Sequence, residues 1–180
     1  MTTNKSFLDY FSLAVTTFGV GYLPFAPGTW GSMVGVGIYL LLEQIELWAI
    51  IRFVPPDWNE SQVTAWVHAI NLLLMLIFTL LGIWAAARAT ELFKNKDPQQ
   101  AVVDEVIGQL ITFLFLPFTF SWKLILLGFL LFRLFDIWKP YPIDYLQSLP
   151  TGIGVCADDI LAGVYAGTCL AIIYAISLNL

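Results

Sequence analysis

The feature that most constrains this chain is a series of five long, mostly apolar runs. They occupy residues 32–53, 64–87, 102–118, 123–138 and 160–178. A helix needs about 20 apolar residues to cross the roughly 30 Å hydrocarbon core of a bilayer. Hydrophobic residues make up 59% of the 180 residues and charged residues only 12%, unlike an ordinary soluble domain. We therefore predict an all-α, polytopic membrane helical bundle with about five spanning segments.

The shorter elements and the domain count follow from the same pattern. Run 7–18 is too short to span and predicts a short N-terminal helix that is interfacial or buried. The third and fourth runs are short and Pro117 ends the third, so we expect them to tilt or to form a tight hairpin through 118–122. No linker-like tract divides the chain, which predicts a single domain over residues 1–180. The oligomeric state stays open.

The basic residues predict the orientation. With the N-terminus in the cytoplasm, only Arg52 and Lys123 lie outside, and six basic residues lie inside: Lys5, Arg88, Lys94, Lys96, Arg133 and Lys139. This distribution fits the positive-inside rule. It also brings polar motifs from four distant segments to one membrane face, so we expect a multi-pass membrane protein whose site faces the cytoplasm.

Two acidic pairs, Asp104-Glu105 and Asp158-Asp159, lie where apolar runs begin. Capping and the helix dipole explain one carboxylate in a first helical turn, but not easily two. Adjacent helical residues point about 100° apart, so one member of each pair can face the bundle centre while the other caps or meets a neighbour. Ionisable groups at membrane depth are costly and usually functional. We interpret both pairs as functional.

Crowded carboxylates either raise one another's pKa or bind a cation. Oxygen ligands without a suitable His or Cys favour magnesium, manganese or calcium over zinc, and magnesium is the usual partner of phosphate chemistry. The net charge of −5 argues against a nucleic-acid partner, which needs a basic surface. An acidic site can still accept a phosphate if metal ions lie between them.

The segment FRLFDIWKP places Arg133, Asp136 and Lys139 at successive spacings of three, on one helical face. A metal ligand flanked by two phosphate contacts would have this pattern, and so would snorkelling basic residues with a neutralising Asp at the end of a membrane helix. Arg133 favours the first interpretation, because it lies inside the apolar run and needs Asp136 or a ligand phosphate as a partner.

The stretch GVGYLPFAPGTWGS, residues 19–32, contains four glycines and two prolines and is predicted not to be regular helix. Its backbone amides, with the hydroxyls of Thr29 and Ser32, can form an anion site at a helix N-terminus. The motif is neither a Walker loop nor a dinucleotide fingerprint. A re-entrant turn buried in protein is an equally good explanation of this stretch alone.

The sequence lacks the residues that other phosphatase mechanisms use as nucleophiles. The single histidine, His68, lies in run 64–87 near Asn71, where an interhelical hydrogen bond explains it. Cys156 and Cys169 have neither metal-ligand spacing nor the Arg five residues on that cysteine phosphatases need. Metal-activated water therefore remains as the nucleophile.

Two other functions could also use acidic residues in a membrane protein. A divalent-cation transporter would place carboxylates at mid-membrane and would show interrupted, repeated helices, whereas here the acids gather at one face. A phospho-alcohol transferase would also use carboxylates and magnesium, but its Asp-Gly-x-x-Ala-Arg signature is absent. The residues alone indicate a metal-dependent membrane enzyme that handles a phosphorylated lipid.

Four motifs give the chain a family resemblance: GYLPFAPGTWGS, DEVIGQ at 104–109, FRLFDIWKPYPI, and GIGVCADDILAG at 152–163. With their spacing, the chain resembles the bacterial phosphatidylglycerophosphatase A family. The resemblance implies a magnesium-dependent phosphatase that removes the terminal phosphate of a phospholipid substrate, phosphatidylglycerophosphate, at the cytoplasmic face of the inner membrane. It also implies metal-associated roles for five acidic residues, Asp104, Glu105, Asp136, Asp158 and Asp159. Four of them, Asp104, Glu105, Asp158 and Asp159, are implied to be catalytic. The implied substrate contacts are Arg133, Lys139, Pro27, Gly28, Thr29 and Ser32.

Overall fold

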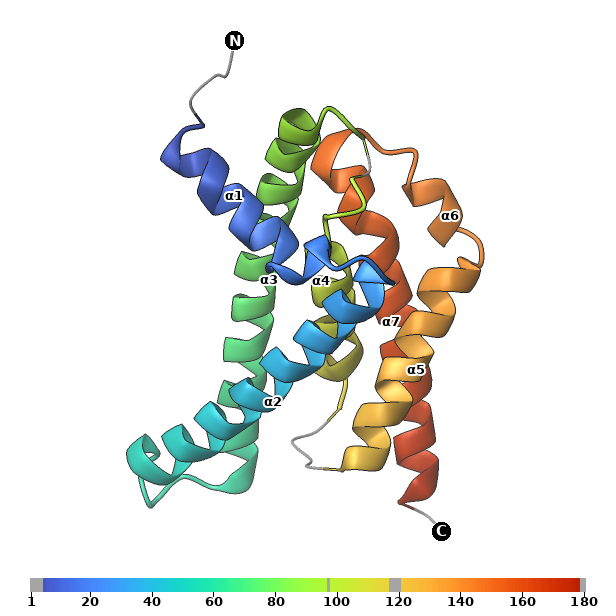
Figure 1. The fold of residues 1–180 in the computed structure, drawn as a ribbon. Helices are drawn as coiled ribbons and strands as arrows, with labels where there is room; N and C mark the ends of the chain where they lie inside the picture. The colour runs from blue at the N-terminus through green and yellow to red at the C-terminus, as the bar shows by residue number, and fades with distance from the viewer. Residues whose placement is uncertain (1–4, 97, 117–120, 179–180) are drawn as a thin grey trace.

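The computed structural model describes residues 5–96, 98–116 and 121–178, and over these residues it contains helices and no strands. In chain order the elements are α1 (Phe7–Thr17), the 3-10 turn η1 (Val20–Tyr22), α2 (Pro27–Phe53), α3 (Glu60–Phe93), α4 (Val103–Leu114), α5 (Trp122–Trp138), α6 (Ile143–Leu146) and α7 (Thr151–Ser177). Figure 1 shows α4 enclosed by the longer helices. The predicted all-α class is confirmed.

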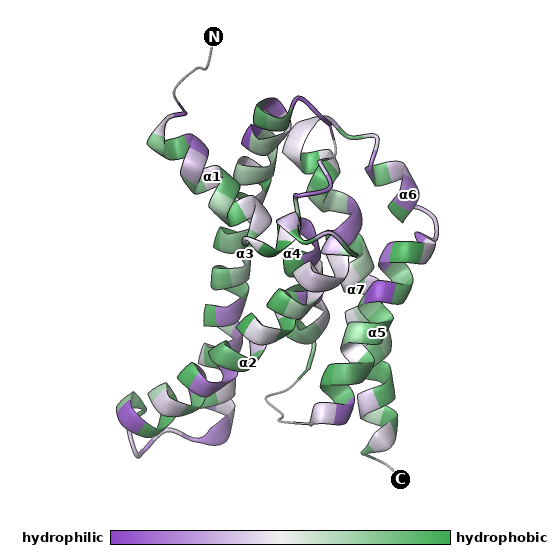
Figure 2. Cartoon of the chain, in the orientation of Figure 1, coloured by the Kyte–Doolittle hydropathy of each residue, from purple (hydrophilic) through white to green (hydrophobic). Residues whose placement is uncertain are grey.

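Three helices, α2, α3 and α7, are long and apolar enough to cross a membrane. Figure 2 shows their mostly hydrophobic middle sections. By contrast, α4 has 12 residues and α5 has 17, which correspond to lengths of roughly 18 and 26 Å. The expected count of about five spans is therefore not confirmed. Most of the expected hairpin through 118–122, and the end of the third run at Pro117, lie outside the described residues.

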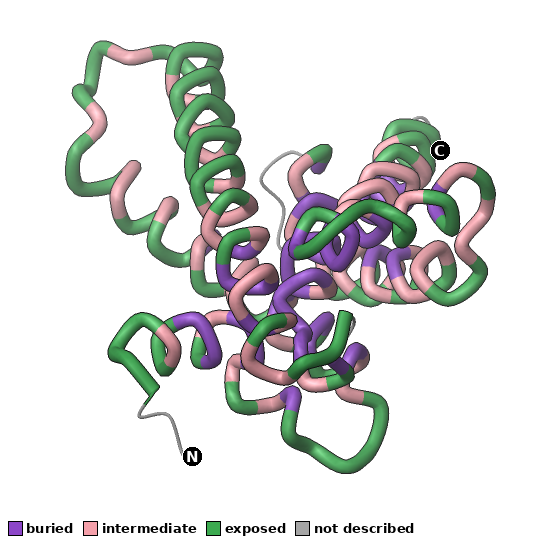
Figure 3. Tube along the Cα trace, turned by 90° about the horizontal axis from the view of Figure 1, so that it is seen from above, coloured by how far each residue is buried: buried purple, intermediate pink, exposed green. Residues whose placement is uncertain are grey.

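The central helix is α4, which contacts α2, α3, α5 and α7. Nine of its twelve residues are buried, and Figure 3 shows the buried positions gathered in this central region. Its polar residues Asp104, Glu105, Gln109 and Thr112 follow one side of the helix, and the burial of Gln109 and Thr112 shows that other helices cover this side too. A helix enclosed in this way can carry charged groups at its first turn without exposing them to hydrocarbon.

Glycines allow α2 to lie close against α4. A Cβ atom at Gly31 would come 2.9 Å from the Val102 Cβ, and one at Gly35 would come 2.8 Å from the Gln109 Cβ. Pro27 is the first residue of α2, where its missing N–H costs no hydrogen bond. The prediction that residues 19–32 are not regular helix is thus wrong for 27–32. The helix forms there because its small residues face α4.

The short N-terminal helix is present as α1 and packs against α3. Ser6 and Asp9 form a capping box at its start, and Asp9 also forms an ion pair with Arg88 of α3 at 2.7 Å. Phe7 and Tyr10 point their rings outward and are largely exposed. The helix thus has one face on the bundle and one aromatic face suited to a membrane interface.

Candidate active site

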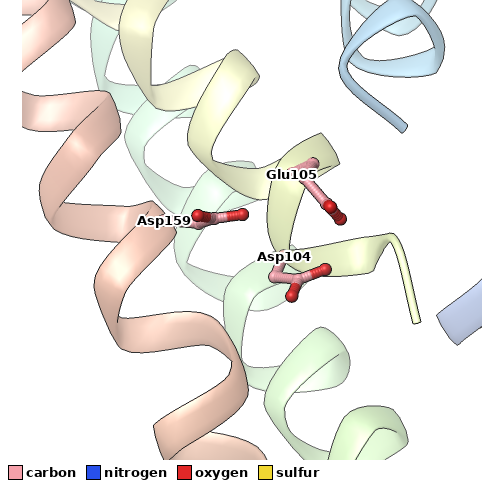
Figure 4. A group of neighbouring side chains, drawn as sticks. All are labelled: Asp104, Glu105 and Asp159. Carbon is pink, nitrogen blue, oxygen red and sulfur yellow. The ribbon is translucent and has the colours of Figure 1, made fainter. Parts of the chain in front are cut away.

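Three carboxylates form the centre of the site. Asp104 and Glu105 come from the first turn of α4 and Asp159 from α7, and one oxygen of each lies within 4.8 Å of the others. Figure 4 shows these side chains from the two helices around one space. The helices meet closely because of glycine, since a Cβ atom at Gly163 would come 3.0 Å from the Gly108 Cα. We call Asp104, Glu105 and Asp159 the acidic triad.

The acidic triad is buried and incompletely hydrogen-bonded. Asp104 is 8% exposed and Asp159 is 3% exposed. Asp104 Oδ1 and Glu105 Oε2 are buried without a hydrogen-bond partner among the described residues. Burial, and then the charge of Glu105, raises the pKa of Asp104 well above its ordinary value, and burial also raises the pKa of Glu105. Such a group of oxygens is stabilised either by protons or by a cation.

The donor set fits a hard divalent cation. It consists of carboxylate oxygens, and unpartnered oxygens point into the shared space. Magnesium and similar ions prefer oxygen ligands, and substrate phosphate and water complete their coordination. The residues present can therefore hold the metal that the sequence predicted, although the geometry does not select one ion.

The sequence predicted that Asp158 and Asp159 lie at the start of a helix, and this prediction is wrong. Helix α7 begins at Thr151, so the pair lies two turns inside it. The N-terminal extension is helical because Gly152 packs tightly on α3, where a Cβ atom would come 2.5 Å from the Ala87 backbone nitrogen. Helix capping therefore cannot explain this acidic pair, because capping acts within the first turn.

The two residues of this pair face different partners. Asp159 joins the acidic triad, whereas Asp158 Oδ2 accepts hydrogen bonds from Lys139 Nζ at 2.6 Å and from Gln147 Nε2 at 2.9 Å. Burial alone would lower the pKa of Lys139, but the hydrogen bond and charge of Asp158, together with the charges of Asp159 and Asp136, more than offset this and the pKa is raised. Asp158 Oδ1 is buried, has no hydrogen-bond partner in the part of the chain that the structure describes, and is available to a ligand.

Arg133 and Asp136 form an ion pair on one face of α5, as their spacing predicted. Arg133 Nη1 lies 2.6 Å from Asp136 Oδ2 and also donates to the Ser32 hydroxyl of α2 at 3.4 Å. Asp136 in turn lies beside Asp159. The arginine thus extends from α5 to the start of α2 and places a permanent positive charge beside the acidic triad.

A cavity of about 1100 Å³ lies beside these carboxylates, and Arg133 is not among the described residues that line it. Its walls include all five predicted acidic residues, together with Lys139 and Pro27. Gly28 packs against Glu105 and Arg133, and the Ser32 hydroxyl donates to the Gly28 carbonyl at 2.9 Å. Thr29 does not line the cavity, and its amide donates to the Ala26 carbonyl at 2.9 Å. The predicted anion site at the start of α2 therefore receives no support from the Thr29 amide.

Several polar residues of this cavity were not predicted as site residues from the sequence, among them Lys94, Lys96 and Gln147. Lys94 and Lys96, after the end of α3, line its mouth, and they had been interpreted only as topology signals. Gln147, between α6 and α7, binds Asp158. Nothing in the residue type distinguished this glutamine from an exposed loop residue, because its role depends on how α6 folds back onto α7.

The sequence matches the family described as phosphatidylglycerophosphatase A over residues 13–174. The chain belongs to this family. The family resemblance drawn from the motifs is thereby confirmed, and the protein is an enzyme of the phosphatase class. The matched range contains the acidic triad, Arg133 and Lys139.

Individual relatives cover most of the chain. A protein of Bacteroides thetaiotaomicron, provisionally named a phosphatidylinositol-3-phosphatase, is 35% identical over 87% of this chain and 89% of its own length. The phosphatidylglycerophosphatase A of Haemophilus influenzae is 33% identical over 89% and 86% of the two chains. That of Escherichia coli is 31% identical over 84% and 76%. No solved structure gave a significant match to the chain.

Proposed function

We propose that this protein, as a single domain of residues 1–180, is a magnesium-dependent phosphatase that hydrolyses the terminal phosphomonoester of phosphatidylglycerophosphate to give phosphatidylglycerol. Two relatives carry the name of this activity. The observation that carries the proposal is the acidic triad, in which Asp104 Oδ1 and Glu105 Oε2 have no hydrogen-bond partner among the described residues, and which opens into the same cavity as Lys139. A phosphomonoester with a divalent cation complements both kinds of group.

In this proposal Asp104, Glu105 and Asp159 hold the metal. When bound, magnesium would neutralise phosphate charge and lower the pKa of a coordinated water. A carboxylate oxygen that is not engaged in metal binding would then orient the attacking water and accept its proton. Asp158 Oδ1 is one candidate, because it is buried in the cavity wall without a hydrogen-bond partner.

The basic residues would contact the phosphate. Arg133 and Lys139 are held in place by carboxylates at 2.6 Å, so their charges need little reorganisation when a phosphate arrives. Asp136 orients Arg133 in this arrangement. Asp136 is also proposed to contact the metal. Lys94 and Lys96 at the cavity mouth would attract the phosphodiester of the same lipid.

The membrane position is also proposed. The site lies at the end of the bundle where α2 begins, and Lys94, Lys96 and Lys139 line its cavity. Arg52 lies in the last turn of α2, and Lys123 in the first turn of α5. By the positive-inside rule, the site end would face the cytoplasm in the bacterial inner membrane.

The test is phosphate release by the full chain purified in detergent. We expect magnesium-dependent release from phosphatidylglycerophosphate, abolished by EDTA and by Asp104→Asn. The Asp57→Asn variant, altered in the exposed loop between α2 and α3, is the matched control and should remain active. Phosphatidylinositol 3-phosphate must be assayed in parallel because of the Bacteroides relative. Faster release from that lipid would overturn the proposed substrate while leaving the phosphatase class intact.

A further inference from the structure

A second cavity, of about 600 Å³, lies between the far halves of α2 and α3 and below the end of α4. Glu43, in its wall, is 16 residues after the start of α2, which corresponds to roughly 24 Å along the helix. The cavity is separated from the acidic triad because α2 and α3 close onto α4 above it, at Gly35 and Gly82. No described residue lines both cavities. Figure 1 shows α2 and α3 diverging toward the loop that joins them.

One end of this cavity is polar. Tyr39, Glu43 and Glu46 follow one face of α2 at spacings of four and three, and Asn71 and His68 face them from α3. Glu43 is only 5% exposed, and its Oε2 has no hydrogen-bond partner among the described residues. Two carboxylates three residues apart repel each other at this depth unless something neutralises them.

The cavity wall supplies little positive charge. No Lys or Arg occurs among the described residues that line it. The only basic group there is the imidazole of His68, whose Nδ1 lies 2.8 Å from the Thr64 carbonyl oxygen. Asn71 approaches Glu46, and Tyr39 approaches Glu43. The unpartnered oxygen of Glu43 therefore calls for a donor from outside the chain.

The other end of the cavity is apolar. Toward α4 the wall is formed by Leu74, Phe78, Leu81, Leu110 and Phe113. Tyr39 stacks on Phe113 with 4.4 Å between ring centroids, and Ile50 and Val63 line the cavity nearest the loop between α2 and α3. Glu43, Glu46 and His68 lie nearer this loop than the apolar end does. This order matches an amphiphile in the leaflet opposite the active site, whose head lies outward and whose acyl chain points to the bilayer centre.

We propose that this cavity binds a phospholipid with a protonated amine in its headgroup, taken from the leaflet opposite the active site. Its ammonium group would donate to Glu43 and Glu46, and one acyl chain would lie along Leu74, Phe78 and Leu110. An ammonium carries three donors and a positive charge, which suits two carboxylates. A lipid whose headgroup is only anionic would instead be repelled. This site does not depend on the proposed phosphatase substrate.

The experiment compares two lipids that differ in the ammonium group, phosphatidylethanolamine and phosphatidylethanol. Native mass spectrometry of the detergent-purified full chain would measure the dissociation constant of each. We expect phosphatidylethanolamine to bind about tenfold tighter, the effect of one charge-assisted hydrogen bond. The double variant Glu43→Gln, Glu46→Gln keeps the shape of the side chains and should lose this preference. Glu60→Gln, exposed at the start of α3, is the matched control and should keep it.

Three results would overturn the proposal. The first is equal affinity of the wild type for both lipids, and the second is a preference for phosphatidylethanolamine that persists in the double variant. The third is a wild-type protein that forms a dimer through this cavity, so that the double variant changes the dissociation of the dimer and not the binding of lipid. If the double variant does not fold, Glu43→Gln alone is measured, because only Glu43 has the buried, unpartnered oxygen. A preference unchanged in Glu43→Gln would equally contradict the assignment.

Discussion

Lys139 Nζ lies 2.6 Å from Asp158 Oδ2, and this ion pair joins the C-terminal end of α5 to the first third of α7. Lys139 adopts a left-handed backbone conformation with φ of 46° directly after α5, which turns its side chain back toward α7. Gln147 donates to the same oxygen. Asp158 is thus fixed from two sides, and Lys139 is held at the wall of the site cavity.

Replacing Lys139 by Met should lower kcat/KM for phosphate release by about 100-fold or more, because a preorganised charge near the phosphate is lost. Lys139→Arg should retain more activity than Lys139→Met. The measurement is steady-state phosphate release at saturating magnesium. Equal activity of the wild type and Lys139→Met would show that Lys139 serves the fold rather than the phosphate.

Gln147→Leu should have a smaller effect, a loss of less than about tenfold, because one neutral hydrogen-bond donor to Asp158 disappears while Lys139 remains. The loss should appear in kcat more than in KM if Gln147 positions Asp158. The kinetic constants of Gln147→Leu and of the control variant Asp144→Asn, exposed on α6 and outside the cavity lining, check this. A change confined to KM would indicate direct substrate contact instead.

Much of the site could be predicted from the sequence, because intramembrane charges have few alternative explanations. Asp104, Glu105 and Arg133 were identified in this way. Two features could not be predicted. The position of Asp158-Asp159 inside α7 depends on how Gly152 packs on α3, and the role of Gln147 depends on the return of α6 to α7. Both are tertiary contacts that leave no local pattern.

The fold shows the same division. The apolar runs predicted helices correctly, yet α4 is a short helix buried by protein rather than a confirmed span. Hydropathy cannot separate these two cases, since a helix covered by lipid and a helix covered by other helices are both apolar. The helical start of α2 was missed for a different reason. Its glycines serve close packing against α4, which composition alone does not distinguish from a loop.

The acidic triad should reduce the stability of the metal-free protein. Asp159→Asn removes one of several buried, mutually repelling carboxylates, so in EDTA this variant should unfold at a higher temperature than the wild type. We expect a gain of about 0.5 to 2 kcal/mol, because one buried carboxylate that repels its neighbours is removed. Thermal unfolding in detergent measures it. A lower midpoint for Asp159→Asn would mean that Asp159 holds the helices together without a cation.

The contact between α2 and α4 can be tested with two glycines of the same helix. Gly35→Ala should destabilise the fold by about 1 to 3 kcal/mol, because its Cβ would press on Gln109 in a closely packed interface. Gly37→Ala is the matched control, since a Cβ there meets nothing within 4 Å. It should be neutral or stabilising by up to about 1 kcal/mol. Equal midpoints of thermal unfolding for both variants would contradict the described packing.

The attachment of α1 should depend on pH. A hydrogen bond from the Ser6 backbone, with Arg88 adding to it, lowers the pKa of Asp9 below its ordinary value of 3.8. A carboxylate whose pKa is lower in the folded protein than in the unfolded chain stabilises the attached helix fully at a pH above its unfolded pKa. This stabilisation is lost as the pH falls through the folded pKa. Below about pH 3.8 we therefore expect α1 to detach progressively.

Pepsin cleavage within α1 would measure this detachment. The rate of cleavage is determined between pH 2 and 5 for the wild type and for Asp9→Asn, and the two rates are expressed as a ratio. The ratio cancels the pH dependence of pepsin itself. Wild type should be the more protected near pH 5, and the difference should vanish toward pH 2. A ratio that does not vary with pH would rule out Asp9 as the titrating group.

The most direct test of the central claim is a titration of Mn²⁺ into metal-free protein, in which bound Mn²⁺ is followed by electron paramagnetic resonance and phosphate release from phosphatidylglycerophosphate is measured in the same samples. We predict that the rate rises in parallel with Mn²⁺ bound to the wild type, and that Asp159→Asn loses both tight binding and activity. Full activity of the wild type in EDTA, or unchanged Mn²⁺ binding in Asp159→Asn, would contradict a metal-dependent reaction at the acidic triad.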